Sequence, residues 1–395
     1  MTKTDSIVIV GTARTPMGGF QGDLKHVAAP ELGATAIRAA LERANVPPGE
    51  VQEVIMGCVL PAGQGQAPAR QASLSAGIPK SVGCTTINKM CGSGMKAAML
   101  AHDLIAAGTN DVMVAGGMES MSNAPYLMPK ARDGLRMGHG ELVDHMFFDG
   151  LEDAYDKGRL MGTFAEDTAD RYGFSRVAQD EFAITSLERA KKAIDDGTFD
   201  KEVTPVTVKT RKGEHVVEHD EQPHKANIEK ISKLRPAFRK NGTVTAANSS
   251  SISDGAAALV LMRSSEAEKR GLNPHARILG HATHAHEPNW FTTAPVDAIG
   301  KVLENTKWST AEVDLFEINE AFAVVTMAAM HDLDLPYGKV NVHGGACALG
   351  HPIGASGARI LVTLLTAMEK YDVRRGVAAL CIGGGEATAM AVERV

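Results

Sequence analysis

The chain has 395 residues, of which 44% are hydrophobic and 22% charged, and its formal net charge is −6. That composition is typical of a globular protein with two or three domain-sized units. The acidic balance disfavours a nucleic-acid-binding or membrane-surface protein, and no stretch reaches the roughly 18 consecutive apolar residues of a membrane span.

The first 120 residues alternate strand-like and helix-like segments. Residues 6–11 have the apolar, β-branched composition of a buried strand; the run is too short for a signal peptide, so we expect a cytoplasmic protein. Residues 31–44 carry apolar side chains at helical spacing, and the prolines within 46–48 end that helix. Residues 53–56 predict another strand. This alternation indicates an α/β fold with a mainly parallel sheet.

Two distant segments, about 260 residues apart, repeat one pattern. In the first, residues 92–117, a glycine-rich turn leads into an apolar helix, a strand and a glycine pair. The second, residues 354–385, has the same order and ends in three glycines. Any α/β protein repeats such units, but these copies favour two homologous halves related by a pseudo-twofold axis.

The region between the halves differs in composition. Residues 121–242 are more charged and include a polar run over 209–229, which is typical of an inserted domain of loops and helices that contacts substrate. We therefore predict three parts: an N-terminal half at 1–120, an inserted loop domain at 121–250 and a C-terminal half at 251–395.

Cys91 is the strongest candidate for a nucleophile. It lies where an extended segment meets a helix, and the free N–H groups and partial positive charge of a helix start stabilise a thiolate. The flanking glycines allow close approach of substrate. The alternative is a packing cysteine, the usual role of this residue type. The five cysteines form no C-x-x-C pair, which disfavours a disulfide framework or a zinc site.

A thiolate nucleophile needs a base, and His351 stands out among the 14 histidines. Pro352 holds it in an extended conformation, and the surrounding glycines permit a tight turn before the helix of the second copy. If the two halves face each other, His351 and Cys91 converge. A structural histidine is an equally acceptable interpretation of these residues alone.

Two further positions carry candidate chemistry. Cys381 ends a buried strand before Ile382 and three glycines, so its thiol suits proton transfer and the following N–H groups suit an oxyanion. Asn319 follows a short strand and suits a helix N-cap or a water-holding role. Glu320 and Glu386 are interpreted as solvated or salt-bridged. The chain has no Walker, G-x-G-x-x-G, H-E-x-x-H or EF-hand motif, which disfavours nucleotide hydrolysis, nicotinamide use and metal catalysis.

Taken together, the motifs resemble those of the thiolase family, in the family's order and along essentially the whole chain. The resemblance implies two similar βαβαβαββ halves in a five-layered αβαβα fold with an inserted loop domain, a homo-oligomer (dimer or tetramer), and catalysis without a cofactor, coenzyme A being substrate and product. The matching blocks are NKMCGSGMKA (88–97), GGMESMS (116–122), KLRPAF (233–238), NEAFA (319–323), GGACALGHPIGASG (344–357) and CIGGG (381–385).

The same resemblance implies a role for each catalytic position. Cys91 would carry the acyl group, and His351 would deprotonate it and help bind the thioester oxygen. Asn319 would hold a water in that first oxyanion hole. Cys381 would move protons to and from the acetyl α-carbon or the CoA sulfur. The N–H groups of Cys91 and Gly383 would form a second oxyanion hole.

The resemblance also predicts the substrate contacts. Matching positions for CoA are Leu151, Met161, Phe238, Ala246 and Ser250, with Phe291 and Phe322 near the acyl group. The chain departs from the common pattern at a few positions, which bear on chain-length preference and CoA affinity. They are Leu160 where short-chain members often have His, Ser251 for Gly, Ser253 for Asn, the Glu386-Ala387 ending, and His224 or Lys225 in place of a basic residue before 233.

The predicted activity is the reversible condensation of two acetyl-CoA to acetoacetyl-CoA and CoA, through an acyl-Cys91 thioester with ping-pong kinetics. A degradative thiolase for longer 3-oxoacyl-CoA uses the same motifs and stays open. A decarboxylating ketoacyl synthase is expected to lack the second cysteine, Cys381. A catalytically silent CoA-binding protein is the alternative outside enzymes.

Overall fold

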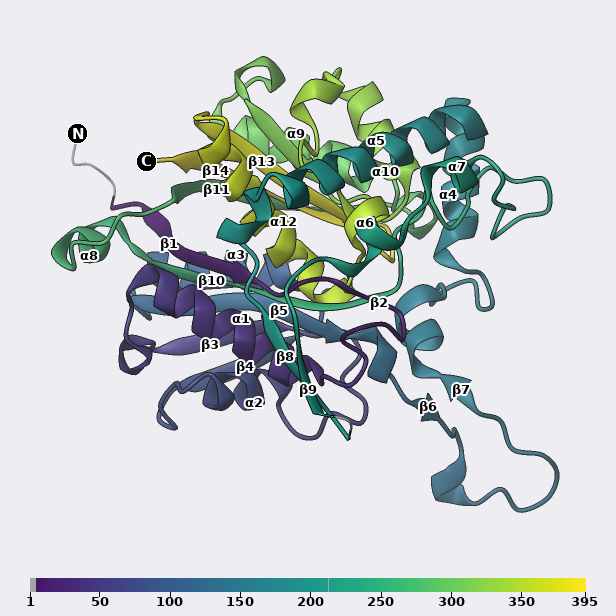
Figure 1. Ribbon diagram of the computed structural model, residues 1–395, viewed down its shortest axis with the longest axis horizontal. Coiled ribbons are helices and arrows are strands. Elements are labelled where there is room, and N and C mark those ends of the chain that lie inside the picture. The colour runs from purple at the N-terminus through teal and green to yellow at the C-terminus, as the bar shows by residue number, and fades with distance from the viewer. Residues whose placement is uncertain (1–4, 212) are drawn as a thin grey trace.

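The computed structural model describes residues 5–211 and 213–395, and its centre is a mixed sheet of 10 strands (Figure 1). The strand order is β12-β13-β14-β11-β1-β10-β5-β3-β4, with β2 (Gly18–Gly19) beside β10. The strands are β1 (Ile7–Arg14), β3 (Glu53–Gly57), β4 (Gly83–Ile87), β5 (Val112–Ser120), β10 (Ser253–Arg263), β11 (Ala276–Ala285), β12 (Leu315–Ile318), β13 (Arg375–Ile382) and β14 (Glu386–Arg394).

The expectation of a mainly parallel sheet is wrong. Parallel pairing is confined to β3 with its neighbours β4 and β5, and to β12 with β13; the other ladders of the sheet are antiparallel. One cause is visible between β13 and β14, where only the three glycines 383–385 separate the strands. So short a connection makes a hairpin, because a parallel crossover needs a dozen or more residues.

Helices cover both faces of this sheet and also lie inside its fold. α1 (Ala29–Ala44) and α2 (Pro68–Ser75) pack on one outer face, and α9 (Ala294–Thr306) and α10 (Ala323–Asp332) lie on the other side. α3 (Ser93–Ala106) and α12 (Ile353–Lys370) share one buried core with strands from both ends of the sheet. The layers therefore run αβαβα (Figure 1), which confirms the predicted fold class.

The two central helices are the predicted repeat, and they touch through glycine. A Cβ added to Gly94 in α3 would lie 2.7 Å from the backbone nitrogen of Ala358, and one on Gly357 in α12 would collide with the backbone of Met95. The contact is thus reciprocal, as a pseudo-twofold axis requires. Because Gly94 is the second residue of α3 and Gly357 the fifth residue of α12, the crossing brings the N-terminal ends of the two helices together.

Residues 121–250 contain loops, short strands and helices, the longest of which is α5 with 20 residues. Strand β10 follows it directly and pairs with β1 and β5 of the first 120 residues; the limits 1–120, 121–250 and 251–395 stay a prediction. The remaining elements are β6 (Tyr126–Leu127), β7 (Val143–Asp144), α4 (Met161–Tyr172), α5 (Arg176–Asp195), β8 (Val206–Thr210), β9 (Gly213–Val217), α6 (Glu221–Lys225), α7 (Ile228–Ile231), α8 (Ser264–Lys269) and α11 (Ala346–Leu349).

Two further features concern the outside of the molecule. The short β6–β7 hairpin and the loop between its strands, residues 124–145, form an arm that projects from the body (Figure 1). Within the described residues, no helix combines the length and the apolar character needed to cross a bilayer.

We predict that Gly357→Ala destabilises the fold. The new methyl group enters the backbone contact between α12 and α3, and overpacking of this kind costs about 1–3 kcal/mol. Gly300→Ala is the matched control, since Gly300 also lies within a helix but a Cβ there meets nothing within 4 Å. That control gains up to about 1 kcal/mol from helix propensity. Urea unfolding of both variants measures the difference; equal stabilisation by the two would contradict the close crossing.

Candidate active site

Cys91 lies in a strained turn between β4 and α3. Met90 before it has a left-handed backbone (φ 49), which is uncommon for a residue with a branched or long side chain. Ser93 holds the turn, because its Oγ accepts from the Lys89 N–H at 2.8 Å and donates to the Met90 carbonyl at 2.6 Å. The turn is therefore specified by its own sequence, and it exposes the Cys91 side chain to a pocket.

The resting state of Cys91 is a thiol. Burial raises the pKa of the Cys91 thiol to about 11, while hydrogen bonds from the N–H groups of Gly383 and of Cys91 itself favour the thiolate. Nearby Glu119 adds a further upward shift in this pKa. The helix start was expected to stabilise a thiolate, but desolvation outweighs it. Attack by Cys91 therefore depends on a base.

His351 can serve as that base. Its Nδ1 lies 2.5 Å from Ser356 Oγ, and the Ser356 hydroxyl donates its proton to the Pro352 carbonyl at 2.9 Å. Ser356 Oγ must then accept from His351 Nδ1–H, which leaves the lone pair on Nε2. Nε2 is buried and has no hydrogen-bond partner within the described residues. Burial, with Arg359 second, lowers the pKa of His351 to about 3, so the ring is neutral and free to accept a proton.

Asn319 presents an unpartnered donor. Its Oδ1 accepts from the Arg359 guanidinium at 3.3 Å, and Arg359 is itself held by Glu317 at 3.1 Å. This orients the amide so that Nδ2 is the free end, and within the described chain that buried nitrogen has no partner. A buried donor of this kind is satisfied by a water or by substrate. Asn319 does not cap a helix, because α10 begins only at Ala323.

Cys381 and the glycine loop complete the centre. Cys381 is the penultimate residue of β13 and is completely buried, and its pKa is raised well above the ordinary value, first by burial and then by nearby Cys91. The loop turns through Gly384 and Gly385, both with positive φ. This turn places the Gly383 N–H against the Cys91 sulfur. Two sulfurs and two converging N–H groups therefore occupy one small volume.

The predicted substrate contacts fall into two adjoining regions. One region is the pocket at Cys91, where Phe238 packs edge-to-face on the pocket residue Phe322 with 5.9 Å between the ring centres. The other is a neighbouring groove that contains Ala246, Lys225 and Lys230. The first region is a small pocket with a cavity volume of about 60 Å³, lined by Met90, Cys91, Gly150, Leu151, Met161, Ser250, Phe291, Ala321, Phe322, His351, Ile353 and Gly383.

Three of the positions that depart from the common pattern contact the backbone or side chains around Cys91 and His351. The Ser251 carbonyl accepts from the His351 N–H at 3.1 Å, and Ser253 Oγ lies 3.3 Å from the same nitrogen. Glu386 forms an ion pair with Lys89, so it links the loop after Cys381 to the turn before Cys91. Leu160 is the residue before α4 and is not among the pocket residues.

Sequence reasoning missed the buried polar supports. Glu119 accepts from the N–H groups of Val59, Leu60 and Gly354 at 2.9–3.1 Å, which ties the loop after β3 to the start of α12. Glu320 was expected to be solvated or salt-bridged; it is instead completely buried. Its carboxylate accepts from Ser186, Asn341 and the Cys347 N–H. The only signal for Glu119 and Ser356 was their place inside the recognised motifs, because their partners are distant in sequence.

Comparison with known proteins agrees with this geometry. The sequence model of the thiolase N-terminal domain matches residues 7–265, and that of the thiolase C-terminal domain matches residues 272–394. The acetyl-CoA acetyltransferase of Cupriavidus necator is 51% identical over 98% of this chain and 99% of its own length. Acetyl-CoA acetyltransferase 2 of Arabidopsis thaliana is 52% identical over 98% of this chain and 96% of its own length. The chain belongs to the thiolase family.

Proposed function

We propose that this thiolase is an acetyl-CoA acetyltransferase, which reversibly condenses two acetyl-CoA to acetoacetyl-CoA and CoA. The observation that carries the proposal is the convergence of Cys91 and His351 on one pocket, with the buried Cys381 thiol close to Cys91 and two backbone N–H groups directed at the Cys91 sulfur. The names of relatives at about half identity over the full chain support the substrate.

In the first half-reaction, His351 Nε2 takes the proton of Cys91, and the thiolate attacks the thioester carbonyl of acetyl-CoA. The imidazolium and a water on Asn319 Nδ2 stabilise the oxyanion; one such donor is worth about 2.7–4 kcal/mol. The C–S bond to CoA then breaks, and the departing sulfur takes a proton from Cys381. The products are acetyl-Cys91, free CoA and a Cys381 thiolate.

In the second half-reaction, the Cys381 thiolate takes a proton from the α-carbon of a second acetyl-CoA. A thiolate whose pKa is raised by burial is a stronger base, which suits the weakly acidic C–H bond. The enolate attacks acetyl-Cys91, and the N–H groups of Cys91 and Gly383 stabilise the new oxyanion. Collapse releases acetoacetyl-CoA, and Cys91 recovers its proton from His351. Every proton is returned, so these residues suffice for the chemistry with CoA as substrate and product.

Substrate contacts follow from the two adjoining regions. The apolar side chains of Met161, Phe291 and Phe322 line the pocket beside Cys91 and suit a short acyl group. The neighbouring groove is lined by Lys225 and Lys230, whose positive charges suit the CoA phosphates. The Lys225 ammonium is paired with Glu221 at 2.5 Å, so Lys230 is the better candidate for the phosphate contact. A longer-chain thiolase is the second candidate, since a pocket lined by flexible side chains such as Met161 can widen.

We predict that the protein cleaves acetoacetyl-CoA when CoA is added, and that Cys91→Ala lowers turnover at least about 10³-fold because the covalent route is lost. Cys84→Ala is the matched control: it is another partly buried free thiol in the strand before the turn, outside the pocket. The assay follows loss of the 3-oxoacyl-CoA. Preference for an eight-carbon 3-oxoacyl-CoA would favour the longer-chain alternative, and binding of CoA without cleavage would favour the silent protein.

A second prediction separates the two cysteines. Cys381→Ala still forms the acyl-enzyme with acetyl-CoA, but condensation falls about 10²–10⁴-fold because the α-carbon loses its base. Mass spectrometry measures the acylated protein, and a coupled assay measures condensation. Cys58→Ala, a buried cysteine that follows β3 directly, controls for loss of a buried thiol. Normal condensation by Cys381→Ala would remove Cys381 from proton transfer.

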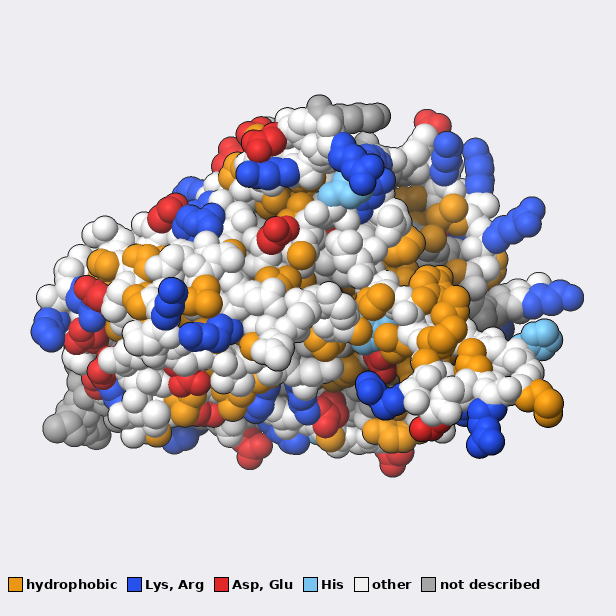
Figure 2. Space-filling model, turned by 90° about the horizontal axis from the view of Figure 1, so that it is seen from below, with side chains coloured by type: hydrophobic (Ala, Val, Ile, Leu, Met, Phe, Trp, Pro, Cys, Tyr) orange, Lys and Arg blue, Asp and Glu red, His pale blue; other side chains and the backbone are white. Residues whose placement is uncertain are grey.

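We further propose a homo-oligomer assembled through the β6–β7 arm, in a cytoplasmic protein. Exposed apolar side chains concentrate on this narrow projection, and Figure 2 shows hydrophobic side chains gathered at that end of the molecule. Exposed apolar clusters of this kind mark protein contacts. The exposed residues are Tyr126, Met128, Leu135, Met137 and Leu142, with Met137 95% exposed.

The arm proposal predicts that the double variant Met137→Glu, Leu142→Glu shifts the protein to a smaller assembly, because two charges enter an apolar contact. Light scattering after gel filtration measures the mass. Val177→Glu is the control, since Val177 is also 65% exposed but lies on α5, outside the arm. An unchanged mass in the double variant would exclude the arm as the contact.

A further inference from the structure

The end of strand β11 carries a histidine pair that the acyl-transfer chemistry does not use. His284 and His286 are two residues apart in this strand and its exit, a spacing that places side chains on the same face. Asp297, in the first turn of α9, lies over that face. Donor atoms of the three side chains all lie within 4.8 Å of one another, and His284 Nε2 is 3.1 Å from Asp297 Oδ2.

Of the two histidines in this cluster, His284 lacks the hydrogen bonds that a structural role provides. Both ring nitrogens of His284 are shielded from solvent and, among the described residues, make no hydrogen bond; the contact with Asp297 is close but badly oriented. His286 Nε2 does have a partner, the Trp290 carbonyl at 2.8 Å, to which it donates. That bond leaves the lone pair on Nδ1. Metal-binding histidines are typically held in this way by a backbone carbonyl on the far side of the ring.

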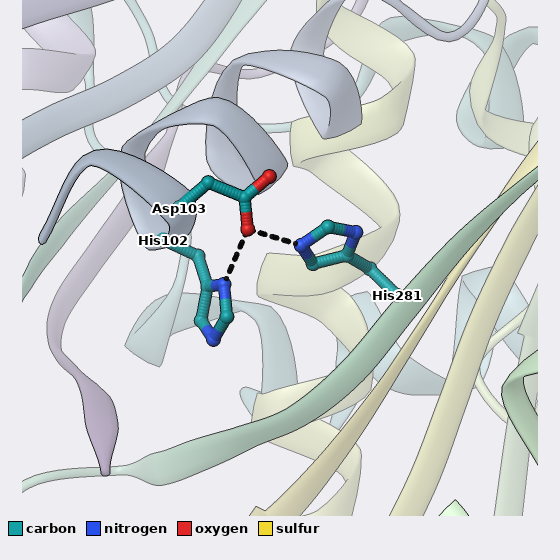
Figure 3. Close-up of side chains that lie close together, drawn as sticks. All are labelled: His102, Asp103 and His281. Carbon is teal, nitrogen blue, oxygen red and sulfur yellow. Dashed lines mark hydrogen bonds and ion pairs between the residues drawn. The ribbon is translucent and has the colours of Figure 1, made fainter. Parts of the chain in front are cut away.

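A second cluster shows what a satisfied arrangement looks like. His102, Asp103 and His281 also lie close together, but one carboxylate oxygen of Asp103 accepts from both rings, at 3.0 Å and 2.9 Å (Figure 3). Hydrogen bonding therefore accounts for this cluster.

We propose that His284, His286 and Asp297 bind a divalent transition-metal ion, Zn²⁺ being the best match. Two imidazole nitrogens and one carboxylate are a common Zn²⁺ ligand set, with bonds of about 2.0–2.2 Å and water in the fourth position. Asp297 is 56% exposed, so the ion and its water have access from solvent. The positive charge of Lys301 lies nearby, but its ammonium group is turned to the Thr283 carbonyl at 3.3 Å.

The bound ion would act on structure and not on the reacting atoms. It would join the end of β11 to α9, across the segment that carries Phe291 into the acyl pocket. The backbone N–H of His286 also donates to the Gly385 carbonyl at 2.9 Å. An ion bound to His286 would therefore also help to fix one end of the glycine loop. The expected result is a higher melting temperature without a requirement for metal in turnover.

Zn²⁺ titration of the full-length protein, monitored by calorimetry and by thermal unfolding, tests the proposal. We expect one saturable site and a melting temperature that rises with free Zn²⁺. Asp297→Asn and His284→Gln weaken this binding at least about tenfold. Asp103→Asn is the matched control, because Asp103 is 53% exposed and also lies between two histidines; its binding stays unchanged.

Co²⁺ distinguishes this site from the five thiols. A site built from nitrogen and oxygen ligands gives visible d–d absorption without the intense near-ultraviolet charge-transfer bands of a thiolate complex. Absence of a stoichiometric site, thiolate bands, or loss of binding in Asp103→Asn with retention in Asp297→Asn would each overturn the assignment. None of these readouts depends on the proposed acetyltransferase activity, so the two proposals stand or fall separately.

Discussion

The close crossing of α3 and α12 is the constraint on which the rest of this structure depends. Two helices approach at the distance seen at Gly94 and Gly357 only when neither has a side chain at the contact. Further small residues extend the fit, since a Cβ on Gly117 would collide with the Gly354 carbonyl and one on Gly57 would lie 2.7 Å from the same oxygen. The turns that precede the helices consequently meet, and those turns carry Cys91 and His351.

Burial at this junction determines the charge state of the site. It raises the pKa of both thiols and lowers that of His351, so the free enzyme holds neutral groups in a place that would penalise any isolated ion. Charge then appears only in pairs, when a proton moves between neighbours or onto substrate. His351 Nε2 is an unpartnered acceptor and Asn319 Nδ2 an unpartnered donor, and both are in place before any charge develops.

Much of the fold and of the site could be predicted from sequence, because the relevant signals are local. Glycine-rich turns before apolar helices located both repeats and their leading residues, and the motif match extended this to the pocket side chains. The errors concern contacts between distant segments. Antiparallel pairing of β10 with β5, the burial of Glu320 and the true start of α10 all depend on tertiary packing that no local pattern records.

Three of the departures predicted from the thiolase resemblance, Ser251, Ser253 and Glu386, have a shared physical character. Ser251 and Ser253 hold the backbone N–H of His351, and Glu386 pairs with Lys89 at the edge of the Cys91 turn. Each acts on the frame that positions a catalytic group, and none replaces a group that would move a proton or bind an oxyanion. Hydrogen bonds to a backbone can be supplied by several side chains, whereas a thiolate or an imidazole cannot be substituted so freely. Variation at these three positions is therefore compatible with an unchanged reaction, while Met161, Phe291 and Phe322 line the pocket beside Cys91 with apolar side chains.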